Sequence, residues 1–228
     1  MRSKSSSFSG EVSSSGAGGD VRKLVFIGDA GVGKTSLLSS YRKGEFHDNE
    51  KEPTPVLEGF TKSVSVQEKD HVCLLWDTIG STDFERLRPL SYPKTDCFVI
   101  CFAINDRTSF DNLKTIWIPE IGLHSPDVPY IFVATKTDIK KSMEPLSSKP
   151  CTKSEDLTTT PPSTILNIEE IMAYITSTDG LDYVECSSHD LVSVENILKS
   201  AVKAILTHEE KLKAIEEANN SKSFCVIC

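Results

Sequence analysis

The sequence lacks a continuous apolar run of about 18 residues, the length that a membrane-spanning helix needs, so we expect no transmembrane segment. It also lacks the pattern of a signal peptide, because Met1 and Arg2 lead into a serine-rich stretch instead of an apolar one. The seven cysteines are odd in number and irregularly spaced, in a chain of 228 residues that is too large to need disulfide bonds. These absences exclude the secreted, fibrous and integral-membrane classes, and we expect a reducing, cytoplasmic compartment.

Basic residues are in the minority. The 25 Lys and Arg residues are outnumbered by 33 Asp and Glu residues, which gives a formal net charge of −8. Because a protein that binds a phosphate backbone needs clustered Lys and Arg, we expect no nucleic-acid partner. Apolar residues make up 38% of the chain, which is enough for the packed core of one domain.

Two tracts of biased composition flank or interrupt this domain, and the sequence has no internal repeats. Residues 1–20 are dominated by Ser and Gly and cannot bury enough apolar surface to fold, so we expect a disordered extension. Residues 140–164 are rich in Ser, Thr and Lys and contain four prolines, which predicts a polar surface insertion. The predicted domain therefore spans residues 21–208, and residues 209–228 form a C-terminal tail.

Within the domain, short apolar runs alternate with amphipathic segments, and this alternation predicts an α/β fold with a mostly parallel six-stranded sheet and helices on both faces. Several runs are almost continuously apolar, as expected for strands covered on both faces. The expected strands are residues 23–27, 63–66, 72–76, 97–104, 130–134 and 183–186. The expected helices are residues 34–42, 109–117, 168–176 and 193–218.

The first strand leads directly into the sequence Gly28-Asp29-Ala30-Gly31-Val32-Gly33-Lys34-Thr35, and a helical pattern follows. This is the G-x-x-x-x-G-K-T phosphate-binding loop in the strand–loop–helix context that it requires, so the fold is a P-loop NTPase. Glycines let backbone N–H groups surround phosphate oxygens, and the lysine neutralises the β- and γ-phosphate charge. The candidate phosphate-binding residues are Asp29, Ala30, Gly31, Val32, Gly33, Lys34, Thr35 and Ser36.

A magnesium site is predicted beside this loop. The Thr35 hydroxyl can coordinate Mg²⁺, and Asp77 follows an apolar strand, where a carboxylate can hold the ion through water. The Gly80 N–H can reach a γ-phosphate, and Thr54 is the candidate second hydroxyl ligand that only a γ-phosphate would recruit.

A second motif bears on the choice of base. Thr135-Lys136-Thr137-Asp138 follows a buried strand, at the sheet edge where such folds bind ligands, and Cys186-Ser187-Ser188 ends the next strand. The Asp138 carboxylate can accept two hydrogen bonds from the N1–H and 2-amino group of guanine, which adenine does not offer. This favours a guanine nucleotide over the two alternatives, a solvated loop that binds no base and an ATP-using P-loop kinase or ATPase.

Together these stretches resemble the Ras superfamily of small GTPases over about residues 21–206. Within it the sequence is similar to the Rho/Rac family in five motifs: 86–93 (Arg-Leu-Arg-Pro-Leu-Ser-Tyr-Pro), Cys101-Phe102, Trp117-x-Pro119-Glu120, Thr135-Lys136-x-Asp138 and Glu185-Cys186-Ser187. The resemblance implies a monomeric GTPase that uses GTP, GDP and Mg²⁺ and signals to the actin cytoskeleton. It also implies effector proteins, guanine nucleotide exchange factors and GDI-type chaperones as partners.

Carried over motif by motif, the resemblance assigns further roles. It makes Phe46 the residue that packs on the base edge, Thr54 the switch I threonine and residues 77–80 the start of switch II. Lys136 and Asp138 hold the base, with Ser187 and Ser188 beside it. The candidate catalytic residues are Lys34, Thr54, Gly80 and Ser81.

Three residues depart from the family pattern near the γ-phosphate. Ser81 stands where the family has the glutamine that orients the attacking water, Ile79 replaces an alanine, and Ala30 replaces a glycine of the Rho loop. An extra proline, Pro55, follows Thr54 in switch I and removes a backbone N–H. We therefore expect slow or impaired hydrolysis, as in the Rnd-type relatives that also lack the glutamine. The alternative is a conventional cycling GTPase whose water is placed by a partner.

The last four residues, Cys225 to Cys228, fit the C-a-a-X pattern for prenylation of Cys225. They also read as C-x-x-C, a redox or metal pair, although no second pair accompanies it. Acidic residues outnumber lysines in residues 207–224, so the usual polybasic companion is missing. Because one lipid alone anchors weakly, we expect reversible attachment to the cytoplasmic face of a membrane, most simply the plasma membrane.

Overall fold

The computed structural model describes residues 21–46, 59–142 and 165–224. Its centre is a six-stranded sheet with the strand order β2-β3-β1-β4-β5-β6. All neighbouring strands are parallel except β2 and β3, which form an antiparallel pair at one edge. The strands are β1 (Val21–Ile27), β2 (Gly59–Val66), β3 (Lys69–Asp77), β4 (Cys97–Ala103), β5 (Tyr130–Thr135) and β6 (Tyr183–Glu185).

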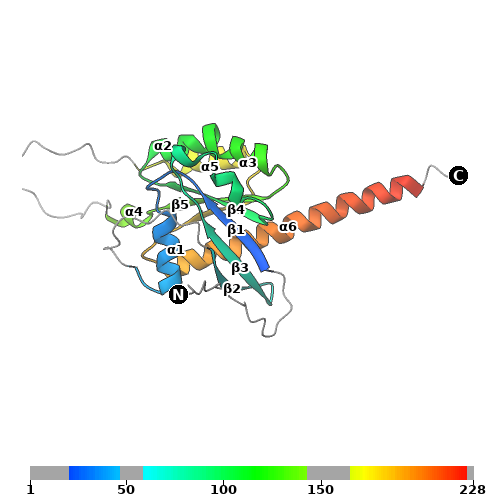
Figure 1. The fold of residues 1–228 in the computed structure, drawn as a ribbon, viewed down its shortest axis with the longest axis horizontal. Coiled ribbons are helices and arrows are strands. Elements are labelled where there is room, and N and C mark those ends of the chain that lie inside the picture. Colours follow the sequence, from blue (N-terminus) through cyan, green and yellow to red (C-terminus); the bar gives the residue numbers. More distant parts are fainter. Residues whose placement is uncertain (1–20, 47–58, 143–164, 225–228) are drawn as a thin grey trace, which may run out of the picture.

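Helices cover both faces of this sheet (Figure 1). One face packs against α1 (Lys34–Lys43) and α6 (Leu191–Phe224). The other packs against α2 (Arg107–Asn112), α3 (Ile118–His124) and α5 (Ile168–Thr176). The α/β architecture predicted from the alternating apolar runs is therefore confirmed.

The two faces are separate halves of one core because side chains alternate along each strand. In β4 every residue is buried. Val99 and Cys101 contribute to the face under α1 and α6, whereas Phe98 and Ile100 contribute to the opposite face. A strand with no exposed side must be apolar throughout, which is why β4 reads as a continuous apolar run.

Helix α1 ends one residue later than predicted, and two other predicted helices differ from the structure by more. The segment predicted as one helix over 109–117 is a longer helical stretch with three parts: α2, a π-helical turn η3 (Leu113–Trp117), and α3. Pro119 does not end the stretch, because it lies in the first turn of α3, where the missing N–H costs little. The final helix begins two residues earlier than predicted and continues beyond Ala218 to Phe224.

The connections that matter for function emerge where the parallel strands end. The loop after β1, the start of the segment after β3 and the loop after β5 all leave the same edge of the sheet. In the described part of the chain, none of the helices combines the length and the apolar character needed to cross a bilayer. The extension at 1–20, most of the insertion at 140–164 and Cys225 lie outside the described residues.

Candidate functional site

The loop between β1 and α1 is shaped by backbone that only glycine tolerates well. Gly28 has a φ of +140°, and a Cβ atom there would lie 2.1 Å from the carbonyl oxygen of Cys101 on β4. Lys34, which is almost fully buried, folds back so that its Nζ donates to the carbonyl oxygens of Gly28 at 2.6 Å and Asp29 at 2.8 Å. Burial lowers the pKa of the Lys34 ammonium. The predicted phosphate-binding residues, Asp29 to Ser36, are therefore gathered in one loop and the first turn of a helix.

The residues predicted to hold magnesium meet at the end of β3. The Thr35 hydroxyl donates to Asp77 Oδ2 at 2.6 Å. The other carboxylate oxygen, Oδ1, is buried and has no hydrogen-bond partner among the described residues. Burial raises the pKa of the Asp77 carboxyl, and the hydrogen bond from Thr35 opposes that shift. A hydroxyl and a carboxylate with an unused oxygen fit a hard cation that keeps several waters, as Mg²⁺ does. Thr54 lies outside the described residues.

The chain after Asp77 touches the phosphate loop. A Cβ atom at Gly80 would lie 2.3 Å from the Gly28 carbonyl oxygen and 2.5 Å from the Ala30 amide nitrogen. Only a glycine allows the two backbones to approach this closely. The contact places the Gly80 amide beside the loop that holds the phosphates.

The residues predicted to recognise the base also lie together. Ser187, just after β6, donates its hydroxyl proton to Asp138 Oδ1 at 2.7 Å, which fixes one oxygen of the carboxylate. Lys136 adopts a left-handed backbone with a φ of +59°. Its side chain passes Gly33, where a Cβ atom would lie 4.0 Å from the lysine Cε. Ser188 is half-buried next to Ser187.

An aromatic pair borders the same region. The Phe46 ring lies 3.8 Å from the His189 ring, centroid to centroid, with 41° between the planes. Phe46 was predicted to pack on the base edge, and its neighbour follows directly after Ser188. His189 was missed by sequence reasoning, because a single histidine after a strand carries no motif.

Ser81, the predicted substitute for the water-orienting glutamine, is engaged locally. It is the N-cap of the short helix η1 (Thr82–Phe84), and its Oγ accepts a hydrogen bond from the Asp83 backbone N–H at 3.3 Å. The Oγ also lies 3.3 Å from Asp83 Oδ2. The hydroxyl is therefore directed along the chain toward Asp83.

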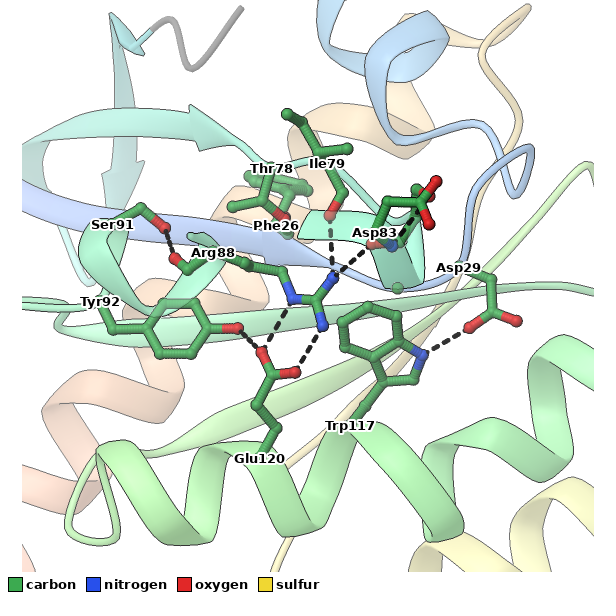
Figure 2. A network of polar contacts seen from close by, with 12 residues as sticks. Phe26, Asp29, Thr78, Ile79, Asp83, Arg88, Ser91, Tyr92, Trp117 and Glu120 are labelled. Carbon is green, nitrogen blue, oxygen red and sulfur yellow. Dashed lines mark hydrogen bonds and ion pairs between the residues drawn. The ribbon is translucent and has the colours of Figure 1, made fainter. Parts of the chain in front are cut away.

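A polar network beneath switch II was not predicted from the sequence (Figure 2). Arg88 opens the helix η2 (Arg88–Ser91), and its guanidinium is bound by both carboxylate oxygens of Glu120 at 2.8 and 2.5 Å. Burial by itself lowers the pKa of Arg88, but the hydrogen bonds and charge of Glu120 outweigh it and raise the pKa. Tyr92 also donates to Glu120, and the Arg88 guanidinium carbon lies 4.4 Å from the centroid of the Trp117 ring. The sequence signal was present, since these residues belong to two of the quoted motifs.

Comparisons with known proteins agree with this geometry. Residues 23–207 match the Ras family of protein domains. The chain is also similar to the Ras-like GTP-binding protein RhoL of Drosophila melanogaster. The two are 37% identical over 183 residues, which cover 80% of this chain and 86% of that protein.

Proposed function

The chain belongs to the Ras family of small GTPases, which bind GTP or GDP with Mg²⁺, and from this premise we propose that it is a Rho-like switch that hydrolyses GTP slowly. The observation that carries the proposal is Ser81. It occupies the position of the water-orienting glutamine, and its hydroxyl is used to cap η1. The proposed role is a signalling protein whose active state is set by expression and nucleotide exchange more than by turnover.

The binding steps follow from the residues already described. Lys34 neutralises charge on the β- and γ-phosphates, and the Gly80 N–H donates to the γ-phosphate. Thr35 and Asp77 hold the metal ion, which when bound neutralises charge that develops on the phosphate oxygens. The Asp138 carboxylate accepts from the guanine ring. Because the γ-phosphate orders the switch segments, the GTP-bound form presents the surface that effector proteins read.

The hydrolytic step is where this chain differs from its relatives. In-line attack needs a water held opposite the β–γ bridge, and the family glutamine holds it with a long side chain. Ser81 is shorter and points toward Asp83. Ile79 adds a branched side chain next to Gly80. Nothing in these changes removes a group that holds phosphate or base, so nucleotide binding is retained while hydrolysis slows.

The decisive experiment is a single-turnover time course of GTP loss from the full chain loaded with GTP and Mg²⁺. We expect the natural chain to retain GTP and Ser81→Gln to hydrolyse it at least about tenfold faster, because the substitution restores the water-orienting side chain. Ser177→Gln is the matched control. It introduces the same side chain at the exposed end of α5, far from the phosphate loop, and should change nothing.

Two outcomes of this experiment would contradict different parts of the proposal. If the natural chain loses GTP as fast as a relative that carries the glutamine, measured side by side, the proposal of slow hydrolysis is wrong and the protein is a conventional cycling switch. If Ser81→Gln stays as slow as the natural chain, Ser81 is not the block. The double variant Ile79→Ala/Ser81→Gln then tests whether Ile79 shares the defect.

The similarity to RhoL and the five Rho-like motifs support a Rho-type role. That role includes effectors, exchange factors and GDI-type chaperones as partners and signalling to the actin cytoskeleton. The C-a-a-X pattern at Cys225 supports prenylation and reversible attachment to the cytoplasmic face of the plasma membrane. Recovery of actin-regulating proteins on the immobilised chain only when it carries a GTP analogue would test the cytoskeletal role.

A further inference from the structure

One helical stretch, from Asn112 to Glu120, contacts the phosphate loop from below. The Asp29 carboxylate accepts hydrogen bonds from Asn112 Nδ2 and from Trp117 Nε1, each at 2.6 Å. The carbonyl oxygen of the same Asp29 accepts from Lys34. Asn112 and Trp117 therefore hold the residue whose backbone holds the phosphate-binding lysine.

The same stretch contacts the start of switch II through Arg88. Glu120 binds one side of the guanidinium. The remaining nitrogen, Nη1, donates to the carbonyl oxygen of Ile79 at 3.0 Å and approaches that of Ser81 at 3.4 Å. These two carbonyls lie on either side of Gly80. Figure 2 shows the guanidinium between Glu120 and the Trp117 ring, with the indole nitrogen directed at Asp29.

These polar contacts lie beside a cavity on this side of switch II. A cavity of about 350 Å³ lies between the phosphate loop, switch II and the helical stretch, and Ala30, Gly80, Ser81, Arg88 and Trp117 are among its lining residues. Gly80 packs against the phosphate loop on one side, and on the cavity side the carbonyls that flank it are held by hydrogen bonds. Arg88 supplies them with a side chain that is 2% exposed.

The π-helical turn explains how both contacts come from one stretch. Residues 113–117 form η3, and such turns widen the helix by one residue. Trp117, at its end, is buried with its nitrogen on Asp29 and its ring against Arg88. Glu120 follows three residues later, on the same side of the helix, where it meets Arg88.

We propose that Trp117 and Glu120 are positioning residues for the γ-phosphate: Trp117 aligns the phosphate loop through Asp29, and Glu120 aligns the Gly80 amide through Arg88. Neither residue touches nucleotide. The two effects differ in a measurable way. The Asp29 contact supports Lys34, which serves the β- and γ-phosphates, whereas the Arg88 contact supports only the Gly80 donor to the γ-phosphate.

The test measures dissociation constants of the full chain for GDP and for a non-hydrolysable GTP analogue, both with Mg²⁺. Glu120→Gln keeps the shape of the side chain but removes the negative charge that binds the Arg88 guanidinium. It should weaken analogue binding about tenfold and leave GDP binding within about twofold. Trp117→Phe keeps an aromatic side chain, with a smaller ring, and removes the N–H. It should weaken the binding of both nucleotides. The loss in the Trp117→Phe/Glu120→Gln double variant should differ from the sum of the single losses, because both residues contact Arg88 and residues with a shared partner couple.

Glu170→Gln is the matched control. It makes the same chemical change in an ion pair with Arg107, at 2.7 Å, on the exposed side of α2 and α5. It should change neither dissociation constant. A merely structural role for Glu120 would lower thermal stability without changing the ratio of the two affinities, so equal losses for GDP and the analogue, or no loss for either, would overturn the proposal.

Removing one partner of a buried ion pair can unfold a protein. A second variant therefore tests the proposal without leaving a buried charge unpaired. Arg88→Met/Glu120→Gln leaves no unpaired charge and keeps an acceptor for the Tyr92 hydroxyl, yet it has no donor for the carbonyls of Ile79 and Ser81. It should again lose analogue binding selectively. The inference rests on the nucleotide binding of the family and not on slow hydrolysis, so a fast natural enzyme would leave these binding results unaffected.

Discussion

The Thr135 hydroxyl lies 2.5 Å from the carbonyl oxygen of Val32 and 3.0 Å from that of Phe102. This contact joins the loop that recognises the base to the loop that surrounds the phosphates, because Thr135 ends β5 and Val32 lies within the phosphate loop. Both side chains are buried, so water cannot replace the hydrogen bond.

Thr135→Val should therefore destabilise the protein by about 1–3 kcal/mol, since it leaves a buried carbonyl without a donor. Because the two loops would move more independently, GDP release should also become faster. Thermal unfolding of the GDP-bound chain and the release rate of a fluorescent GDP measure the two effects. Thr176→Val on the exposed face of α5 is the control. Equal behaviour of the two variants would show that the contact has no role.

Gly80→Ala should destabilise the protein for a different reason. The added methyl would lie 2.3 Å from the Gly28 carbonyl oxygen, with backbone on all sides and no flexible side chain to yield. We expect a stability loss of about 1–3 kcal/mol from overpacking and weaker binding of a GTP analogue. Gly122→Ala serves for comparison. A Cβ there meets nothing within 4 Å on the exposed face of α3. The substitution should therefore stabilise the protein by about 0.5–1 kcal/mol. A Gly80→Ala protein with unchanged unfolding would contradict the close contact.

The four cysteines of the described part of the chain should be unreactive in the folded protein. Burial raises the pKa of Cys73 and Cys186 to about 11 and that of Cys101 to about 12, and it also raises the pKa of Cys97. At pH 8 about one thiol in a thousand with a pKa of 11 is ionised, and at pH 9 the ionised fraction is still only about one in a hundred. Iodoacetamide labelling followed by mass spectrometry should modify these positions only after unfolding. Rapid labelling of Cys101 in the native chain would contradict the burial.

Membrane association should depend on Cys225, one of the two cysteines among the last four residues. Protein made in cells that prenylate should partition into detergent, and Cys225→Ser should abolish partitioning, because it removes the predicted lipid acceptor. Cys228→Ser distinguishes the two interpretations of the tail. It destroys a C-x-x-C pair but leaves a C-a-a-X pattern, so it should partition like the natural chain. Equal partitioning of Cys225→Ser and the natural chain would rule out the lipid anchor.

Much of the fold was predictable because the strands are buried on both sides. β4 and β5 are apolar at nearly every position, and the phosphate loop has a spacing that few other structures use. The helix ends were harder to predict. Pro119 usually signals a helix end, and here it occupies the first turn of the next helix, whose start depends on the preceding π turn. A π turn has no sequence period of its own, so tertiary packing decides it.

The candidate site also has one part that the sequence predicts and one part that only the fold reveals. Lys34, Thr35 and Asp77 were predicted to act together from motif spacing alone, and they lie within hydrogen-bond reach of one another or of the same loop. The contact from Asp29 to Trp117 spans 88 positions along the chain. Without the fold, no local pattern reports that an aspartate in a phosphate loop and a tryptophan in a helix are neighbours.

The final helix has a geometric consequence if Cys225 is prenylated as proposed. From Leu191 to Phe224 it contains no glycine or proline that would bend it, and Figure 1 shows its C-terminal half extending well past the globular part. At 1.5 Å per residue, the part after Ile205 is about 28 Å long. With a lipid on the residue that follows Phe224, this rod would act as a strut. It would fix the distance and the tilt of the nucleotide-binding face relative to the bilayer, whereas a flexible linker would fix neither.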